Sequence, residues 1–296
     1  MRFASPEESA PTVGAALASA IARLCAAGVA EPEADAQVLL AHALATSRAG
    51  VIAAARDPLG PAAAVRMESL LNRRAAREPV AYVVGVREFW SLALAVDRRV
   101  LIPRPETELL VETALRRAAH AQRVLDAGTG SGAVAAALAR ELPRATVWAS
   151  DCSLGALAVA RGNCARLAPG VGLLAGDLLA PVRGRSIDLV VSNPPYVSEP
   201  ALAAVAPEVR GFEPREALAA GVDGLAVLRR LVADAARVLV PGGWLLVEIG
   251  AGQATMVQSL FEATGCYTET VIEHDHAGIP RVVGARRRGD AEWTAS

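Results

Sequence analysis

The sequence predicts an α/β protein in which a doubly wound, mostly parallel sheet follows a small helical bundle. The first eighty residues carry apolar side chains at helical spacing. From residue 123 onward, short β-branched runs alternate with helical segments, a pattern typical of parallel sheets. The chain has 296 residues, which is enough for two domains with a sizeable core.

Composition excludes several classes of protein. The formal net charge is −1, so the chain as a whole lacks a polyanion-binding signature. No apolar run approaches the roughly 18 residues of a membrane span, and residues 1–8 lack the apolar core of a signal peptide. The four cysteines are far apart without C-x-x-C spacing, which argues for reduced thiols and against a zinc site or disulfides. We expect a soluble cytoplasmic protein with no membrane partner.

The first domain, residues 1–78, is predicted to be a bundle of four short helices. Thr12 is a candidate N-cap for the first helix, and Pro32 opens the second. Ser47 is a candidate cap for the third, and Pro61 begins the fourth. No residue of this segment suggests catalysis, so we expect the bundle to recognise a partner or to cover the site.

A linker is expected over residues 79–100. Residues 80–85 and 89–96 are rich in apolar and aromatic side chains and predict a β-hairpin joined near residues 86–88.

The proline-stiffened segment after the hairpin leads into a helix from about residue 108. One interpretation is an ordinary helix start capped by Thr107. The other is a loop over a ligand, in which Arg104 and Glu106 make polar contacts. The sequence favours neither.

A strand, a glycine-rich turn and a helix follow over residues 124–140. Glycines allow a tight turn and a close approach of ligand to backbone at the helix start. Asp151 ends the next strand, about twenty residues later. In nucleotide-binding folds a carboxylate at this position accepts hydrogen bonds from the hydroxyl groups of a ribose. Gly128, Gly130 and Ala133 also satisfy a loose dinucleotide fingerprint, so the motif predicts the fold without deciding the ligand.

The remaining units complete the alternation. Asp177 follows a third strand, where it could accept a hydrogen bond from an adenine amino group while Leu178 packs on the ring. The further elements are strands at 171–174, 187–191, 244–250, 267–272 and 281–285, helices at 224–239 and 253–264, and a turn at 241–243. This second domain spans residues 101–286, and residues 287–296 form a tail.

The segment Ser-Asn-Pro-Pro-Tyr at residues 192–196 carries the most specific chemistry. It ends a buried strand, because neither proline can donate a ladder hydrogen bond. The Asn193 side-chain oxygen and the Pro194 carbonyl could accept both N–H groups of a planar amide or amino group, and Tyr196 offers a flat face for stacking. Such bonds would aim a weakly nucleophilic nitrogen at an electrophile.

Together these motifs resemble the HemK-type protein-(glutamine-N5) methyltransferases that modify peptide chain release factors. The resemblance covers nearly the whole chain and implies a seven-stranded methyltransferase (Rossmann-like) sheet. The matching segments are residues 102–108, 126–132, Asp151, Asp177, 193–196 and 212–215. The glycine motif indicates only the broad class of methyltransferases. The proline-arginine loop, which is residues 102–108, and residues 212–215 narrow the resemblance to this family.

The resemblance implies S-adenosylmethionine as methyl donor, S-adenosylhomocysteine as product and no metal. The acceptor would be the glutamine of the Gly-Gly-Gln motif of a release factor, a protein substrate, with no direct nucleic-acid binding. Residues implied to contact the donor are Gly128, Thr129, Gly130, Ser131, Gly132, Asp151, Asp177, Leu178 and Asn193. Residues implied to bind or activate the amide are Asn193, Pro194, Pro195 and Tyr196. Some relatives carry an aromatic residue where Leu178 stands.

Four other functions share part of this pattern. A methyltransferase acting on a glutamine of a large-subunit ribosomal protein would share residues 193–196. An adenine-N6 nucleic-acid methyltransferase uses the same logic but would need a basic groove or an added recognition domain. A nicotinamide-dependent dehydrogenase fits the glycines yet leaves residues 193–196 without a role. A non-enzymatic adaptor is disfavoured because every element of the site is present.

Overall fold

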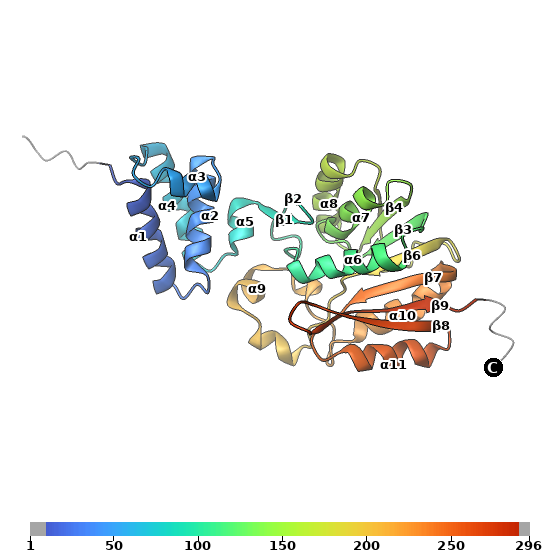
Figure 1. Ribbon diagram of the computed structural model, residues 1–296. Helices are drawn as coiled ribbons and strands as arrows, with labels where there is room; N and C mark the ends of the chain where they lie inside the picture. Colours follow the sequence, from blue (N-terminus) through green and yellow to red (C-terminus); the bar gives the residue numbers. More distant parts are fainter. Residues whose placement is uncertain (1–9, 290–296) are drawn as a thin grey trace, which may run out of the picture. The chain divides into compact units, whose positions relative to one another are not determined.

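The computed structural model describes residues 10–289, which divide into two compact units (Figure 1). The first unit comprises residues up to Gly85 together with residues 207–212, and the second contains the rest. Within residues 10–289, every helix is too short or too polar to cross a membrane.

The first unit is a bundle of short helices, as predicted. Its helices are α1 (Val13–Ala26), α2 (Pro32–Leu44), α3 (Arg48–Ala53), α4 (Pro61–Ala75), α5 (Val80–Val84) and α9 (Pro207–Phe212). The Thr12 hydroxyl accepts from the backbone N–H of Ala15, and the Ser47 hydroxyl from that of Gly50. Both predicted caps are therefore confirmed. Leu24, Leu39 and Leu40 are fully buried between the helices.

Helix α9 joins this unit through a cluster of ion pairs. Arg74, buried at the end of α4, contacts Asp35 at 2.6 Å and Glu208 of α9 at 3.0 Å. Arg77 contacts the second oxygen of Glu208 at 2.8 Å. These partners hold the pKa of Glu208 below its usual value against the opposing effect of burial.

The strand predicted over residues 80–85 is wrong. These residues form α5, which ends where Gly85 adopts a left-handed conformation. The hairpin lies further on, between β1 (Val86–Phe89) and β2 (Leu92–Ala95), so residues 86–88 belong to a strand. Its turn residues, Trp90 and Ser91, both have positive φ. A short run of apolar residues fits helix and strand equally well, and the glycine here ends a helix.

A seven-stranded, mostly parallel sheet forms the centre of the second unit, as predicted. The order is β5-β4-β3-β6-β7-β9-β8, and β9 runs antiparallel to both of its neighbours. The strands are β3 (Arg123–Ala127), β4 (Thr146–Asp151), β5 (Gly172–Ala175), β6 (Ile187–Ser192), β7 (Leu239–Glu248), β8 (Tyr267–His274) and β9 (Pro280–Arg287). The helices are α6 (Glu108–Arg117), α7 (Ala133–Glu141), α8 (Leu154–Leu167), α10 (Ala226–Val238) and α11 (Ala254–Thr264).

Both faces of the sheet are buried, which explains the continuous apolar strands of the sequence. Leu189 and Val191 of β6 pack with α6 and α7 in one core, whereas Val190 packs with α10 and α11 in the other. Figure 1 shows these helix pairs on opposite sides of the sheet.

Two elements differ from the sequence prediction. Residues 241–243, predicted to be a turn before a strand, lie inside β7 at an irregularity, where the pairing moves from Ile187–Leu239 to Leu189–Trp244. Helix α8 was not assigned from the sequence, because its apolar residues form only a weak stripe.

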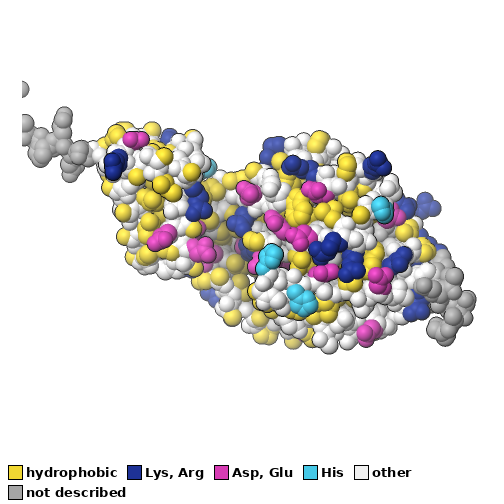
Figure 2. Space-filling view, viewed as in Figure 1, with side chains coloured by type: hydrophobic (Ala, Val, Ile, Leu, Met, Phe, Trp, Pro, Cys, Tyr) yellow, Lys and Arg dark blue, Asp and Glu magenta, His cyan; other side chains and the backbone are white. Residues whose placement is uncertain are grey.

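Charged side chains of both signs are interspersed on the face of the second unit seen in Figure 2. Arg116 and Arg117 of α6, for example, contact the two oxygens of Glu273 at 3.1 and 3.2 Å. This view therefore shows no continuous basic groove on that face among the residues it describes.

Candidate active site

The site is built where the strand order reverses. From β3 the chain proceeds outward through β4 to β5 and then returns to the other side of β3 as β6. Ligands of open α/β sheets bind at this point, outside the carboxyl ends of the strands. Asp126 pairs with Val191 in the parallel register, so the turn at Gly128 and the side chain of Asn193 emerge next to each other.

The loop after β3 is held by hydrogen bonds to the end of β4. The backbone N–H groups of Gly128 and Thr129 both donate to the Ser150 carbonyl, at 2.8 and 3.0 Å. The N–H of Gly130 donates to one oxygen of Asp151 at 2.9 Å, and that of Ser153 donates to the other at the same distance. Each carboxylate oxygen keeps a second lone pair, so Asp151 can still accept from a hydroxyl group.

Asp126 is fully buried beneath this loop. One of its oxygens accepts from the Thr129 hydroxyl at 2.6 Å and from the Ala135 N–H at 3.1 Å. Burial nevertheless raises the pKa of Asp126 to about 7, with a smaller contribution from the negative charge of Asp151. The carboxyl ties the loop to the start of α7, a role for which the sequence carries no local signal.

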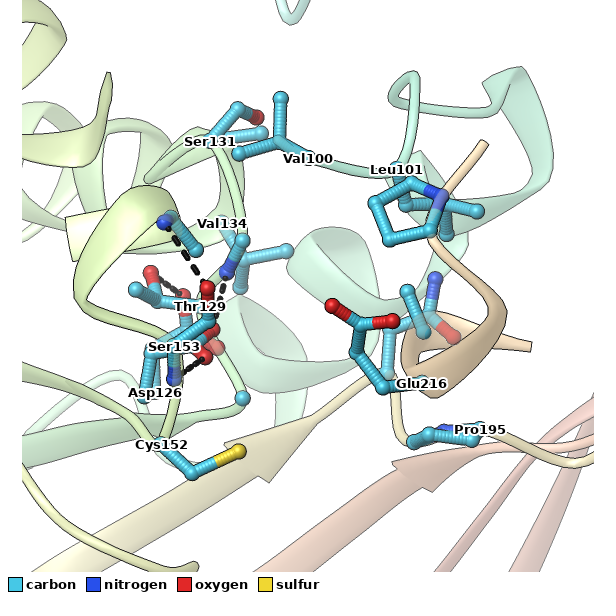
Figure 3. Close-up of a pocket in the computed structure, with 18 of the residues that line it drawn as sticks. Val100, Leu101, Asp126, Thr129, Ser131, Val134, Cys152, Ser153, Pro195 and Glu216 are labelled. Carbon is cyan, nitrogen blue, oxygen red and sulfur yellow. Dashed lines mark hydrogen bonds between the residues drawn. The ribbon is translucent and has the colours of Figure 1, made fainter. Parts of the chain in front are cut away.

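A cavity of about 270 Å³ opens in front of the loop. In Figure 3, Thr129, Ser153 and Cys152 lie on one wall, and the carboxyl group of Glu216 extends from the opposite side. Of the predicted site residues, those lining this cavity are Gly128, Thr129, Gly130, Ser131, Asp151, Asp177, Leu178, Asn193 and Pro195.

Other predicted residues are not among those that line it. Gly132 packs against α8 instead: a Cβ there would lie 3.1 Å from the Cys164 sulfur. Pro194, Tyr196, Arg104 and Glu106 also do not line the cavity.

Asn193 faces the start of α6, directly after the proline-arginine loop. Its Nδ2 donates to the Thr107 hydroxyl at 3.1 Å, which leaves Oδ1 without a partner among residues 10–289. Thr107 stands at the N-cap position of α6, as one interpretation of the sequence expected, but its side chain makes no capping bond and its hydroxyl accepts from Asn193 instead. The ladder between β6 and β7 ends at Ser192 and Val247, so the Pro194 carbonyl lies beyond the last strand pair.

Tyr196 is partly buried beside Glu248, the last residue of β7. Its hydroxyl lies 3.4 Å from Glu248 Oε1. Burial raises the pKa of Tyr196 to about 12, and the neighbouring charge of Glu248 adds to the shift. Burial likewise raises the pKa of Glu248 to about 7. Glu248 follows no motif in the sequence, and only the register of β6 and β7 places it near Asn193.

Arg104 binds another part of the protein. Its guanidinium contacts the buried Glu213 carboxylate at 2.5 Å, and the second oxygen of Glu213 accepts from the N–H of Ile102 at 3.2 Å. The proline-arginine loop and the segment 212–215 therefore hold each other in place. Glu216, three residues further along the chain than Glu213, reaches the cavity and was missed from the sequence.

Asp177 and Leu178 border the cavity at the end of β5. The Asp177 carboxylate is about half exposed and forms an ion pair with Arg230 of α10. Leu178 has a φ of +49°, and its carbonyl accepts from the Ser150 hydroxyl at 3.2 Å. Arg230, which lines the same cavity, was also not predicted.

Two family models match the chain. The PrmC N-terminal domain matches residues 15–85, and the methyltransferase small domain matches residues 105–208. The second match contains the glycine loop, Asp151, Asp177 and residues 193–196.

The chain is also similar to named proteins over most of its length. The release factor glutamine methyltransferase of Geobacter sulfurreducens is 45% identical over 259 residues, which cover 88% of this chain and 91% of that protein. The enzyme of the same name from Moorella thermoacetica is 44% identical over 281 residues, covering 94% and 99%.

Among solved structures, the hMettl16 catalytic domain in complex with an RNA hairpin has a TM-score of 0.56 at 14% identity, covering 75% of this chain and 83% of that one. That likeness concerns the fold alone. The identity and coverage of the sequence relatives are decisive for the family: the chain belongs to the release factor glutamine methyltransferases and is a methyltransferase enzyme.

Proposed function

We propose that this enzyme transfers a methyl group from S-adenosylmethionine to the side-chain amide nitrogen of the glutamine in the Gly-Gly-Gln motif of peptide chain release factors. The observation that carries the proposal is the position of Asn193 at the junction of two features. It lines the cavity in front of the glycine loop, and it begins the Pro-Pro-Tyr segment at the reversal of strand order. The named relatives support the choice of substrate.

The residues around the cavity fit the donor. The glycine loop exposes backbone toward the cavity, and Asp151 retains acceptor capacity for a ribose diol. Asp177 and Leu178 would border the adenine, with Arg230 already paired to the Asp177 carboxylate. When bound, S-adenosylmethionine supplies a methyl group on a positively charged sulfur, which leaves as neutral S-adenosylhomocysteine.

The acceptor amide would be held by Asn193 and Pro194. An amide nitrogen is a poor nucleophile because its lone pair is delocalised into the carbonyl. Hydrogen bonds from its two N–H groups to Asn193 Oδ1 and to the Pro194 carbonyl would fix its direction and stabilise the positive charge that develops on it. The ring of Tyr196 would pack against the planar amide, and the released proton would pass to water.

The protein needs little acid–base catalysis for this reaction. Its contribution is alignment of nitrogen, methyl carbon and sulfur, for which effective molarities of about 10⁵ M or more are attainable. We place the reaction in the cytoplasm, where release factors act during translation.

Transfer of a labelled methyl group to purified release factor tests the proposal. The matched control is the same factor with the tripeptide glutamine changed to alanine. We expect label only when the glutamine is present. Label on both proteins would contradict the acceptor, and label on neither would reject the substrate. Parallel assays with large-subunit ribosomal proteins and with DNA would then decide between the remaining acceptors.

A further inference from the structure

The side-chain amide of Asn193 has two ends of nearly equal shape, and only one suits the proposed substrate. The oxygen end can accept an N–H from the acceptor amide, whereas the nitrogen end would meet that N–H donor with another. In the structure Nδ2 is turned away, toward the Thr107 hydroxyl at 3.1 Å. The orientation of Asn193 therefore depends on Thr107 acting as an acceptor.

A threonine hydroxyl has one proton to donate and lone pairs to accept with. Thr107 is only 3% exposed, so water does not readily take its proton. If that proton pointed toward Asn193, the preferred orientation of the amide would invert. A dedicated acceptor for the Thr107 proton is therefore required.

Glu248 provides that acceptor. Glu248 is 2% exposed, and the nearby Thr107 hydroxyl favours the ionised form of its carboxyl by lowering its pKa against the opposing effect of burial. Oε1 faces the Tyr196 hydroxyl at 3.4 Å. Oε2 is buried and makes no hydrogen bond among the described residues, so its lone pairs are free to accept one from the Thr107 hydroxyl.

We propose that Glu248 and Thr107 form a positioning relay that decides which end of the Asn193 amide faces the substrate. The Glu248 carboxylate accepts a hydrogen bond from the Thr107 hydroxyl, and the Thr107 oxygen accepts one from Nδ2–H of Asn193. Oδ1 of Asn193 then remains free to accept from the substrate amide. Glu248 and Thr107 are positioning residues, because they act through Asn193. The inference rests on the proposed function, since the orientation matters only for an acceptor that brings N–H groups.

The relay predicts a dependence on pH. Burial and the negative charge of Glu106 raise the pKa of Glu248 to about 7, while Thr107, Tyr196 and Arg281 oppose the shift. The ionised carboxylate accepts with both oxygens, whereas the protonated acid has a proton of its own to place. Turnover should therefore rise as pH increases through about 7.

Three threonine variants test the relay in the methyl-transfer assay with intact release factor. Thr107→Val should lower kcat about 10- to 100-fold. The bond from Asn193 Nδ2 to residue 107 is lost, and the amide can then turn its nitrogen toward the N–H groups of the substrate. The variant's dissociation constant for S-adenosylmethionine should stay within about threefold, since the hydroxyl serves the acceptor side. Thr107→Ser, which keeps the hydroxyl, should restore kcat. Thr113→Val is the matched control, because Thr113 is a buried threonine of α6, the helix that Thr107 precedes, and its hydroxyl contacts Arg116.

Glu248→Gln supplies the second measurement. Its kcat should remain near the low-pH level of the wild type and should not rise around pH 7. Wild-type kcat in Thr107→Val, or a rise near pH 7 that persists in Glu248→Gln, would overturn the relay. A loss in Thr107→Val that Thr107→Ser does not restore would also overturn it. If Thr107→Val lost donor binding through misfolding, the Glu248→Gln profile alone would decide. Wild-type enzyme that fails to label release factor would instead reject the proposed function.

Discussion

The two loops that meet at the reversal of strand order are built in different ways. The glycine loop after β3 is held almost entirely by backbone groups and by two carboxylates at the ends of adjacent strands, Asp126 and Asp151. The segment after β6 depends on side chains from distant parts of the chain, with Asn193 bound to Thr107 and Tyr196 beside Glu248. One loop is held by contacts with the next strand, about twenty residues away, and the other by contacts with residues more than fifty positions away.

This difference suggests separate duties. Backbone N–H groups and fixed carboxylates suit a donor that is the same in every reaction cycle. Orientable amides and hydroxyls suit recognition of the acceptor nitrogen, where direction decides the rate. Substitutions on the two sides should therefore affect donor binding and turnover separately.

The largest effect is expected from Asn193→Ala. Removing Oδ1 eliminates a bond that strengthens as charge develops on the nitrogen, so kcat should fall by about 100-fold or more. Affinity for S-adenosylmethionine should change by less than about threefold, as measured by calorimetry. A loss confined to donor affinity would contradict the role given to Asn193.

Asp151→Ala should show the opposite pattern. The carboxylate supports Gly130 and Ser153 and retains lone pairs for a ribose diol. Loss of charged hydrogen bonds should weaken donor binding by about 10- to 100-fold. At saturating donor, kcat should recover to near the wild-type value. Failure of kcat to recover would mean that the two loops are not separable.

Two glycines of the donor loop should differ in their effect on stability. Gly132 has a φ of +82°, and an added Cβ would lie 3.1 Å from the Cys164 sulfur. Gly130 has a φ of +54° with nothing within 4 Å of the added atom. We expect Gly132→Ala to lower the free energy of unfolding by about 2–3 kcal/mol and Gly130→Ala by about 1 kcal/mol, in urea titrations. Equal losses would show that backbone strain alone matters there.

The smallest effect is expected from Asp177→Ala. Its carboxylate is half exposed and already engaged with Arg230, so solvent screens its charge. Donor affinity should fall by no more than about threefold. A loss as large as that of Asp151→Ala would show that Asp177 directly holds the adenine amino group.

The helical caps show how far local sequence determines structure. Thr12 and Ser47 cap their helices as predicted, because an N-cap is a contact between residues three apart. Thr107 has the same sequence signature but makes no cap, since its hydroxyl serves Asn193, 86 residues away. The residues 80–85 were misassigned for a related reason: their apolar run is compatible with either element until packing selects one.

The sequence by itself determined the class of sheet, the glycine loop, the carboxylate at the end of β4 and the Asn-Pro-Pro-Tyr segment. These features arise from periodicity, turn chemistry and the limits that proline and glycine place on the backbone, all of which act over a few residues. Only the tertiary structure placed Glu248 and Thr107 beside Asn193 and Tyr196, paired Arg104 with Glu213 and brought Glu216 to the cavity. Those contacts depend on strand order and register, which join residues separated by scores of positions and leave no local pattern to read.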